Sequence, residues 1–171
     1  MIYHFSDLQL IAVLLMTITL TASSVIDLQQ KILPDYLTAI TLAIGLAVLA
    51  VDPIRIGGWQ DAAVGFAAGF GGSWLFREIV WRIKGVEAMG FGDVKLFGVI
   101  GVWVGFEGVV SAALCGSVLT ILVVLARYII TRKGSMKDEI PFGPGICAGF
   151  LITVLVGPIG RIIFADILPA Y

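Results

Sequence analysis

Long apolar runs, separated by short polar segments, dominate the pattern of hydrophobic and polar positions along the chain. A helix that crosses a bilayer needs about 20 mostly apolar residues, and fewer where the bilayer is thin. Runs of this kind cover residues 8–26, 36–51, 60–76, 94–106, 109–130 and 142–160. The pattern therefore predicts an all-α fold, a polytopic transmembrane bundle of about six helices that forms a single domain over residues 1–171.

Composition strengthens the membrane interpretation. The chain has 171 residues, of which 59% are hydrophobic and 13% charged, whereas soluble domains are about 45–50% apolar and about 25% charged. A net charge of −1 without a basic block argues against a nucleic-acid partner. Cys115 and Cys147 stand alone in apolar runs, so we expect small buried side chains. A single histidine, His4, argues against a zinc-protease site, and no metal or other cofactor is expected.

The distribution of lysine and arginine predicts the orientation of the bundle. Positively charged loops stay in the cytoplasm. Arg55 and Arg161 lie on one side of the predicted bundle, and the other nine cations lie on the opposite side: Lys31, Arg77, Arg82, Lys84, Lys95, Arg127, Arg132, Lys133 and Lys137. The split places both termini outside and the loops after the first, third and fifth runs in the cytoplasm. The predicted location is the cytoplasmic (inner) membrane.

Two further patterns concern packing and the membrane surface. Charged residues alternate with bulky apolar residues over positions 77–84. This pattern predicts an amphipathic continuation of the third helix, with Trp81 at the lipid headgroups. The alternative interpretation is that this segment makes the first contact with a substrate. Glycines four residues apart let helices approach closely, and we expect helix packing from three such pairs, at positions 65 and 69, 101 and 105, and 145 and 149.

Two aspartates border the apolar runs on the same predicted cytoplasmic side. Asp27 ends the first run, and Asp93 begins the fourth, directly after Gly90, Phe91 and Gly92. A carboxylate beside lipid is costly, so it is usually paired, neutralised or used in chemistry. The glycines can admit another backbone and can adopt dihedral angles closed to other residues. A structural alternative stays open for each: a headgroup position for Asp27 and a helix N-terminus for Asp93.

The neighbouring charges have simpler interpretations. Asp35 follows Pro34 and suits a cap at the entry of the second helix. Lys95 is expected to reach lipid phosphates rather than to act directly in catalysis. Solvated loop charges are expected at Glu78, Asp138 and Glu139. A rigid, kinked entry to the last helix is predicted by the stretch Pro141-Phe142-Gly143-Pro144.

Three stretches together resemble the type IV prepilin peptidase family of membrane aspartic proteases. They are Asp27 ahead of Pro34-Asp35-Tyr36-Leu37-Thr38, then Gly90-Phe91-Gly92-Asp93-Val94-Lys95-Leu96, then Pro141-Phe142-Gly143-Pro144. The resemblance implies that Asp27 and Asp93 are the catalytic pair. It implies supporting roles for Gly90, Gly92, Lys95, Pro141, Phe142, Gly143 and Pro144. The implied reaction is removal of the basic leader from type IV prepilins or pseudopilins at the cytoplasmic membrane face, without a cofactor.

The chain departs from the fuller members of this family. Those members carry a cytoplasmic region with Cys-x-x-Cys pairs and methylate the new N-terminus, whereas this sequence begins almost directly with its first apolar run. The expectation is therefore a short, protease-only form. Two alternatives remain: an archaeal preflagellin-type peptidase, and a small proton-coupled transporter or channel subunit with Asp27 and Asp93 as ion ligands. A transporter site would lie near the bilayer midplane, whereas the positive-inside pattern predicts the cytoplasmic edge.

Overall fold

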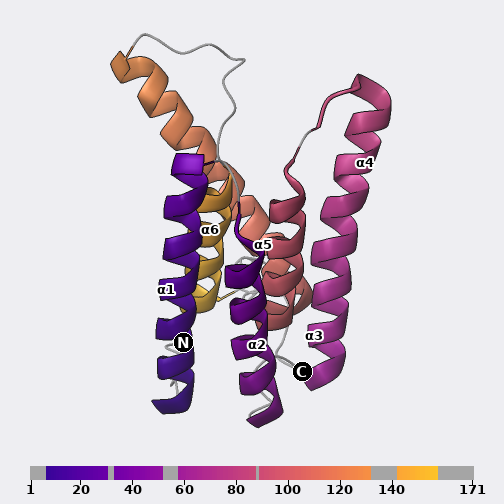
Figure 1. Cartoon of the computed structure of the whole chain (residues 1–171), viewed down its shortest axis with the longest axis vertical. Helices are drawn as coiled ribbons and strands as arrows, with labels where there is room; N and C mark the ends of the chain where they lie inside the picture. The colour runs from indigo at the N-terminus through magenta and orange to yellow at the C-terminus, as the bar shows by residue number, and fades with distance from the viewer. Residues whose placement is uncertain (1–6, 31–32, 52–57, 88, 132–141, 158–171) are drawn as a thin grey trace, which may run out of the picture.

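The structure is a computed structural model that describes residues 7–30, 33–51, 58–87, 89–131 and 142–157. Across these residues the chain is helical and contains no strand, which confirms the all-α class. The helices in chain order are α1 (Asp7–Gln30), α2 (Asp35–Val51), α3 (Gly58–Phe66), the π-helical segment η2 (Ala67–Gly71), α4 (Gly72–Lys84), α5 (Phe91–Thr131) and α6 (Gly143–Val156) (Figure 1).

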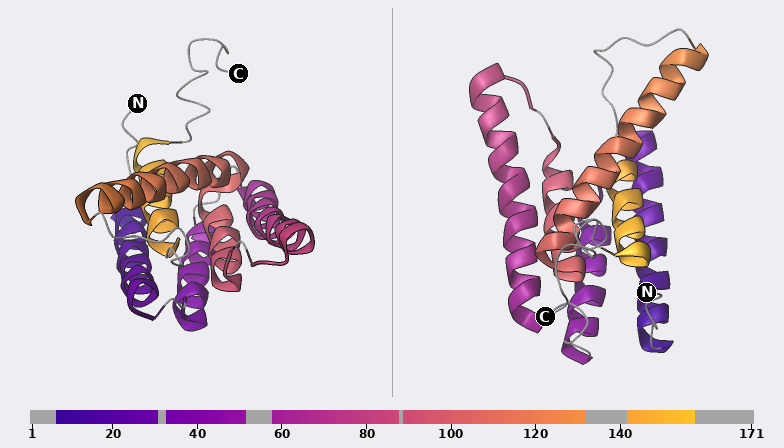
Figure 2. Two further views of the ribbon diagram at one scale, coloured as in Figure 1. Left: turned by 90° about the horizontal axis from the view of Figure 1, so that it is seen from above. Right: turned by 180° about the vertical axis from the view of Figure 1, so that it is seen from behind.

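The helices run up and down beside one another. α1 and α2 form an antiparallel pair, and α3, η2 and α4 form one long rod on the far side of the bundle (Figure 1). α5 descends next to that rod, turns and returns obliquely across α6, which also contacts α1 (Figure 2). The C-terminal end of α1, the beginning of α5 and the beginning of α6 therefore lie at the same end of the bundle. This shared end is where the two predicted catalytic aspartates belong.

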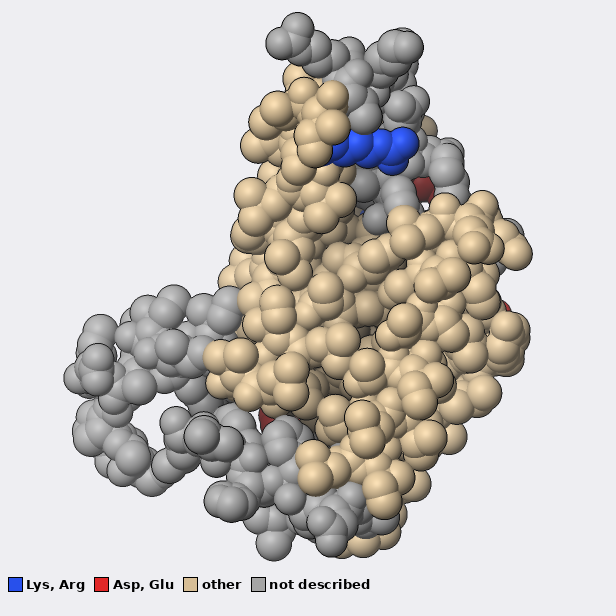
Figure 3. All heavy atoms as spheres, turned by 90° about the vertical axis from the view of Figure 1, so that its left-hand side faces the viewer, with Lys and Arg blue, Asp and Glu red and all other residues tan. Residues whose placement is uncertain are grey.

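The outer surface suits lipid. Two of the described helical segments are long and apolar enough to cross a bilayer, Leu10–Gln30 and Phe91–Ile130, with mean hydropathies of 2.0 and 2.5. Only 28% and 22% of their most apolar windows are buried inside the protein, whereas the core helix of a soluble protein is mostly buried. The face that α1 presents is almost entirely free of charged side chains (Figure 3). These features are typical of a membrane protein.

The predicted fourth and fifth helices meet without a loop. α5 runs through 41 residues, and its helical dihedral angles are interrupted at Gly105, where φ is 66° and ψ is −172°. A positive φ of this kind favours glycine, because a Cβ would strain the backbone. A Cβ at Gly105 would also collide with the Asp61 carboxylate of α3. The boundary predicted between residues 106 and 109 is therefore a kink at Gly105.

The third predicted helix and its amphipathic continuation form a continuous rod, as expected. α3 passes into α4 through the π-helical segment η2, where Gly69 packs against the backbone of Phe97 in α5. A π-helical turn is a known way to adjust a helix locally without ending it. α4 continues along the direction of α3 and extends beyond the neighbouring helix ends (Figures 1 and 2). The position of Trp81 at the lipid headgroups stays a prediction.

The glycine pairs pack closely against other helices, as predicted. A Cβ at Gly65 would collide with the backbone of Gly101 and Gly105, which makes the crossing of α3 and α5 a contact between main chains. On the other side of α5, Gly145 and Gly149 of α6 approach the backbone of Gly116 in the same way. Lipid is as apolar as the helix surfaces, so no hydrophobic effect drives the helices together in a bilayer. They associate through close packing and hydrogen bonds instead, which glycine contacts of this kind permit.

Candidate active site

Asp27 lies in the last turn of α1 and is almost fully buried, with 7% of the residue exposed. Its Oδ2 atom accepts a hydrogen bond of 3.1 Å from the backbone N–H of Gly143, the first residue of α6. The N-terminus of a helix favours a negative group, because its unpaired N–H groups and the helix dipole both point toward the anion. The fold thus places the Asp27 carboxylate at the N-terminus of α6, although Asp27 and Gly143 are far apart in sequence.

The start of α6 is shaped for this contact. A Cβ at Gly143 would lie 2.6 Å from Asp27 Oδ2, so glycine alone lets the carboxylate reach the backbone. Phe142 precedes the helix, and its ring centroid lies 6.4 Å from that of Phe97 in α5. Pro144 occupies the first turn of α6, a position where proline costs no hydrogen bond. Pro141, the remaining residue of the predicted stretch, lies outside the described residues.

Asp93 lies in the first turn of α5 and is buried to a similar extent, with 9% exposed. The backbone N–H of Gly90 lies beside this carboxylate. A Cβ built on Gly90 would meet only Asp93 Oδ2, at 3.7 Å, whereas a Cβ on Gly92 would lie 2.8 Å from the Leu33 Cβ. Gly90 therefore leaves open space beside the carboxylate, and Gly92 lets the segment between α1 and α2 pack closely.

These two glycines do not use the backbone freedom that the residue type permits. The described glycines with positive φ are Gly58, Gly85, Gly105 and Gly157, so neither Gly90 nor Gly92 adopts a dihedral angle that other residues avoid. Lack of a side chain, rather than backbone freedom, is what the site needs from Gly92.

The two carboxyl groups lie near enough to interact electrostatically, and the Cys147 thiol lies near enough to interact with both of them. Cys147 is buried, as predicted, and lies beside the Ser24 side chain. Among the described residues, no ion pair involves Asp27 or Asp93. Two acidic groups that share a buried position without a cation can hold one proton between them, which is the arrangement used for acid–base hydrolysis.

The sequence motifs did not indicate that Cys147 and Ser24 lie near this site. A usable signal exists, because Gly143 and Cys147 lie four residues apart and residues at this spacing share a helix face. Ser24 precedes Asp27 by three residues and lies on the same face of α1 for the same reason. What the sequence does not contain is the docking of α6 onto α1, which is a tertiary contact.

Lys95 has a protein partner, and its contact with lipid phosphates stays a prediction. Its Nζ atom lies 2.6 Å from Asp35 Oδ1 and 5.2 Å from the centroid of the Phe91 ring. Asp35 begins α2, as predicted, and its side chain is 74% exposed. The pair therefore ties α2 to the beginning of α5 at the edge of the site.

Glu78 is not the loop charge that was expected. It lies in α4 and forms an ion pair of 2.9 Å with Arg82, one helical turn later. Asp138 and Glu139 lie outside the described residues.

Comparison with known proteins supplies the family. Residues 14–125, which include both aspartates, match the type IV leader peptidase family. The chain belongs to this family. It is 34% identical over 140 residues to a prepilin leader peptidase/N-methyltransferase of Burkholderia pseudomallei (strain 1026b), a match that covers 81% of this chain and 44% of the relative. The prediction from the three sequence stretches is thereby confirmed at the level of the family.

Other relatives give the same result. The chain is 34% identical over 146 residues to a type 4 prepilin-like proteins leader peptide-processing enzyme of Escherichia coli O78:H11 (strain H10407 / ETEC), covering 84% of the chain and 51% of the relative. It is 33% identical over 156 residues to a prepilin leader peptidase/N-methyltransferase of Pseudomonas putida, covering 89% and 52%. The chain thus spans about half the length of the curated relatives it matches. No solved structure matches it.

Proposed function

We propose that this chain is an aspartic endopeptidase that removes the basic leader peptide from type IV prepilins or pseudopilins. The observation that carries the proposal is that two buried carboxyl groups, Asp27 and Asp93, lie near enough to interact electrostatically at one end of the helix bundle, in a chain that belongs to a leader peptidase family. Relatives named for prepilin processing support this choice of substrate. The proposal is confined to the peptidase reaction.

The proposed reaction starts with one proton shared by the pair, because two neighbouring carboxylates cannot both ionise easily. The ionised carboxylate takes a proton from water, and the water oxygen attacks the carbonyl carbon of the scissile peptide. The protonated carboxyl gives its proton to the carbonyl oxygen, so a neutral tetrahedral diol forms. The pair then passes a proton from a diol hydroxyl to the leaving nitrogen as the C–N bond breaks. The products are the leader carboxyl and a free amine, and the pair again holds one proton.

The orientation that we propose places the site at the cytoplasmic face of the inner membrane, with both termini outside and six membrane passes. The passes are α1, α2, the α3–α4 rod, the two parts of α5 on either side of Gly105, and α6. Support comes from the split of nine cations to two and from the shared end of Asp27 and Asp93.

The orientation is tested by cysteine labelling in a background without Cys115 and Cys147. Gln60 is an exposed residue near the beginning of α3. Glu87 is an exposed residue in the segment that follows α4, at the opposite end of the α3–α4 rod. An impermeant thiol reagent applied from outside should label Gln60→Cys and leave Glu87→Cys unlabelled. Labelling in the reverse pattern would place the carboxyl pair on the outer face and contradict the proposed orientation.

The activity is tested with the purified chain in lipid vesicles and a type IV prepilin precursor. We expect a leader fragment and a mature product whose masses correspond to hydrolysis of one peptide bond, and we expect the same rate with a chelator present. A preflagellin precursor tests the archaeal alternative, and a proton flux without cleavage would support the transporter alternative. Absence of cleavage of the prepilin by the wild-type chain would contradict the proposed function.

A further inference from the structure

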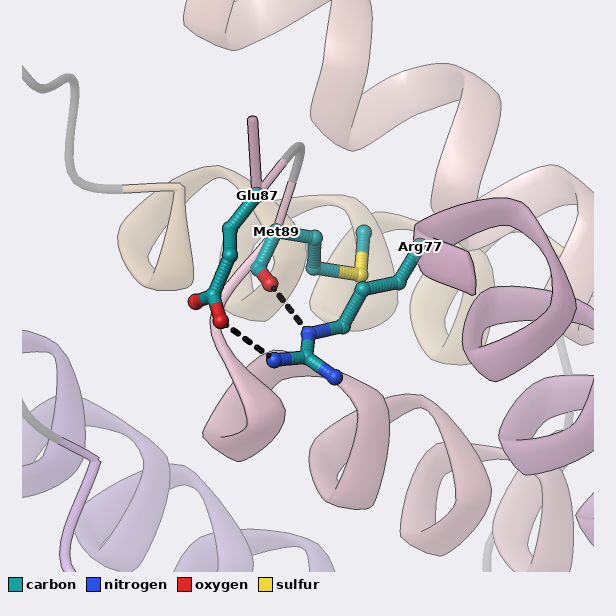
Figure 4. Close-up of polar contacts among 3 residues, drawn as sticks. All are labelled: Arg77, Glu87 and Met89. Carbon is teal, nitrogen blue, oxygen red and sulfur yellow. Dashed lines mark hydrogen bonds and ion pairs between the residues drawn. The ribbon is translucent and has the colours of Figure 1, made fainter. Parts of the chain in front are cut away.

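Arg77 connects α4 to the segment that leads into Asp93. Its Nε atom donates a hydrogen bond of 3.1 Å to the carbonyl oxygen of Met89, and its Nη2 atom lies 2.8 Å from Glu87 Oε1 (Figure 4). The guanidinium carbon also lies 5.9 Å from the centroid of the Phe91 ring. A side chain in the middle of α4 therefore contacts the residues on both sides of Gly90.

The contact with Met89 matters because of the peptide unit to which its carbonyl belongs. A peptide group is planar, so the Met89 carbonyl and the Gly90 N–H move as one rigid unit and point in opposite directions. Arg77 holds the carbonyl. The N–H of the same unit lies beside the Asp93 carboxylate, whose Oδ2 atom is 3.7 Å from the Cβ position of Gly90. Rotation of this unit would break the hydrogen bond to Arg77 and turn the N–H away from Asp93. The orientation of the donor to Asp93 thus depends on a cation twelve residues earlier in the chain.

The hydrogen bond from Arg77 to the Met89 carbonyl oxygen is stronger than the ion pair between Arg77 and Glu87. The Arg77 side chain is 23% exposed, whereas the Glu87 side chain is 65% exposed, so water competes with the ion pair. Exposed ion pairs contribute little, while a hydrogen bond from a charged donor in a partly buried position is stronger than one between neutral groups. A charged donor on the carbonyl also polarises the peptide group and strengthens its N–H as a donor.

We propose that Arg77 is a positioning residue for Asp93, acting through the Met89–Gly90 peptide unit. It holds the Gly90 N–H on the Asp93 carboxylate and so keeps that carboxylate in its place beside Asp27. Arg77 itself does not touch substrate or the reacting atoms. The inference rests on the proposed function for its effect on catalysis, and it predicts a structural effect at Gly90 that is independent of activity.

The catalytic test compares Arg77→Met, which keeps a long side chain but has no donor, with Arg77→Lys, which keeps a cationic donor. We expect Arg77→Met to lower kcat for the prepilin precursor about 10- to 100-fold, the loss typical of a hydrogen bond to a charged group, with KM changed less than about twofold. Arg77→Lys should recover part of the lost kcat. Arg82→Met is the matched control, because Arg82 lies on the same helix and pairs only locally with Glu78; its kcat should stay within about twofold of wild type.

The structural test measures amide hydrogen exchange at Gly90 in protein labelled with ¹⁵N-glycine, with the resonance assigned from its loss in Gly90→Ala. Exchange at Gly90 should be at least about tenfold faster in Arg77→Met than in wild type, and unchanged in Arg82→Met. Unchanged exchange at Gly90, or a kcat in Arg77→Met equal to that of Arg82→Met, would overturn the inference. If the wild-type chain does not cleave the precursor, the proposed function fails, and the exchange result alone then decides the role of Arg77.

Discussion

Two sets of acidic residues near one end of the bundle differ in both burial and partners. Asp27 and Asp93 are 7% and 9% exposed; the Gly143 N–H hydrogen-bonds the Asp27 carboxylate, and the Gly90 N–H lies beside that of Asp93. The side chains of Asp35 and Glu87 are 74% and 65% exposed, and each forms an ion pair with a cation, Lys95 and Arg77 respectively. Among the residues that the structure describes, the carboxylates that are costly to bury thus form no ion pair, whereas those that water already stabilises each form one.

The difference in burial and partners separates carboxylates that can take part in proton transfer from those that hold segments in place. A buried carboxylate that is paired with a cation has its charge neutralised and is a poor proton carrier, whereas two buried carboxyl groups beside one another can exchange a proton with a substrate. The exposed pairs join segments around the site: Lys95 joins α5 to α2, and Arg77 joins α4 to the residues before α5. Substitutions in the two sets should therefore have very different consequences.

The largest effect is expected at the buried pair. Asn keeps the shape of Asp but cannot carry the acid proton, so Asp27→Asn and Asp93→Asn should each lower the cleavage rate by about 1,000-fold or more, with the double substitution scarcely worse because both residues act as one unit. Initial rates with the prepilin precursor, and membrane insertion measured in parallel, check this outcome. Wild-type cleavage by either single variant would exclude the pair as the catalytic centre.

A smaller but still large effect is expected at the backbone donor to Asp27. Gly143→Ala would place a Cβ 2.6 Å from Asp27 Oδ2 and displace the carboxylate. A displacement of about 1 Å in a catalytic group can cost about 100-fold in rate, so a loss of about 10- to 100-fold is expected. Gly71→Ala is the control, since nothing lies within 4 Å of its Cβ position. Equal rates in the two variants would show that the Gly143 contact is not needed.

The glycine crossing of α3 and α5 should affect stability rather than chemistry. Gly101→Ala forces a Cβ into the backbone of Gly65, and overpacking of this kind costs about 1–3 kcal/mol. The melting temperature in detergent should fall, while Gly72→Ala, which has open space around it, should leave the melting temperature unchanged or raise it slightly. Below the melting temperature, kcat of Gly101→Ala should remain close to that of wild type. A loss of kcat without a lower melting temperature would contradict this assignment.

The smallest effect is expected at the exposed pair. Asp35→Asn and Lys95→Gln each remove an ion pair whose side chains are 74% and 35% exposed, and exposed pairs contribute at most about 1 kcal/mol. We therefore expect each variant to keep its cleavage rate within about threefold of wild type, and the double variant to be no worse than either single one. A loss as large as that of Asp93→Asn would move Lys95 from a supporting to a catalytic role.

The sequence by itself determined the all-α class and the family, and it indicated Asp27 and Asp93 as the candidate catalytic acids. Apolar runs predicted the helical segments because every backbone group in lipid must be satisfied internally, and the spacing of glycines predicted which helix faces pack closely. The stretches around Asp27 and Asp93 were sufficient to predict the family. These features depend on local periodicity and on short motifs, which a single chain displays directly.

Only the tertiary structure decided the partners. The Gly143 N–H on Asp27, the Cys147 thiol beside both carboxyls and the Arg77 contact with Met89 each join residues from different helices or from across a turn. The kink at Gly105 likewise depends on how α5 meets Asp61 of α3. A local pattern states which side chains a helix presents, but the partner of each side chain depends on how the helices dock, because close packing selects one arrangement of the whole bundle.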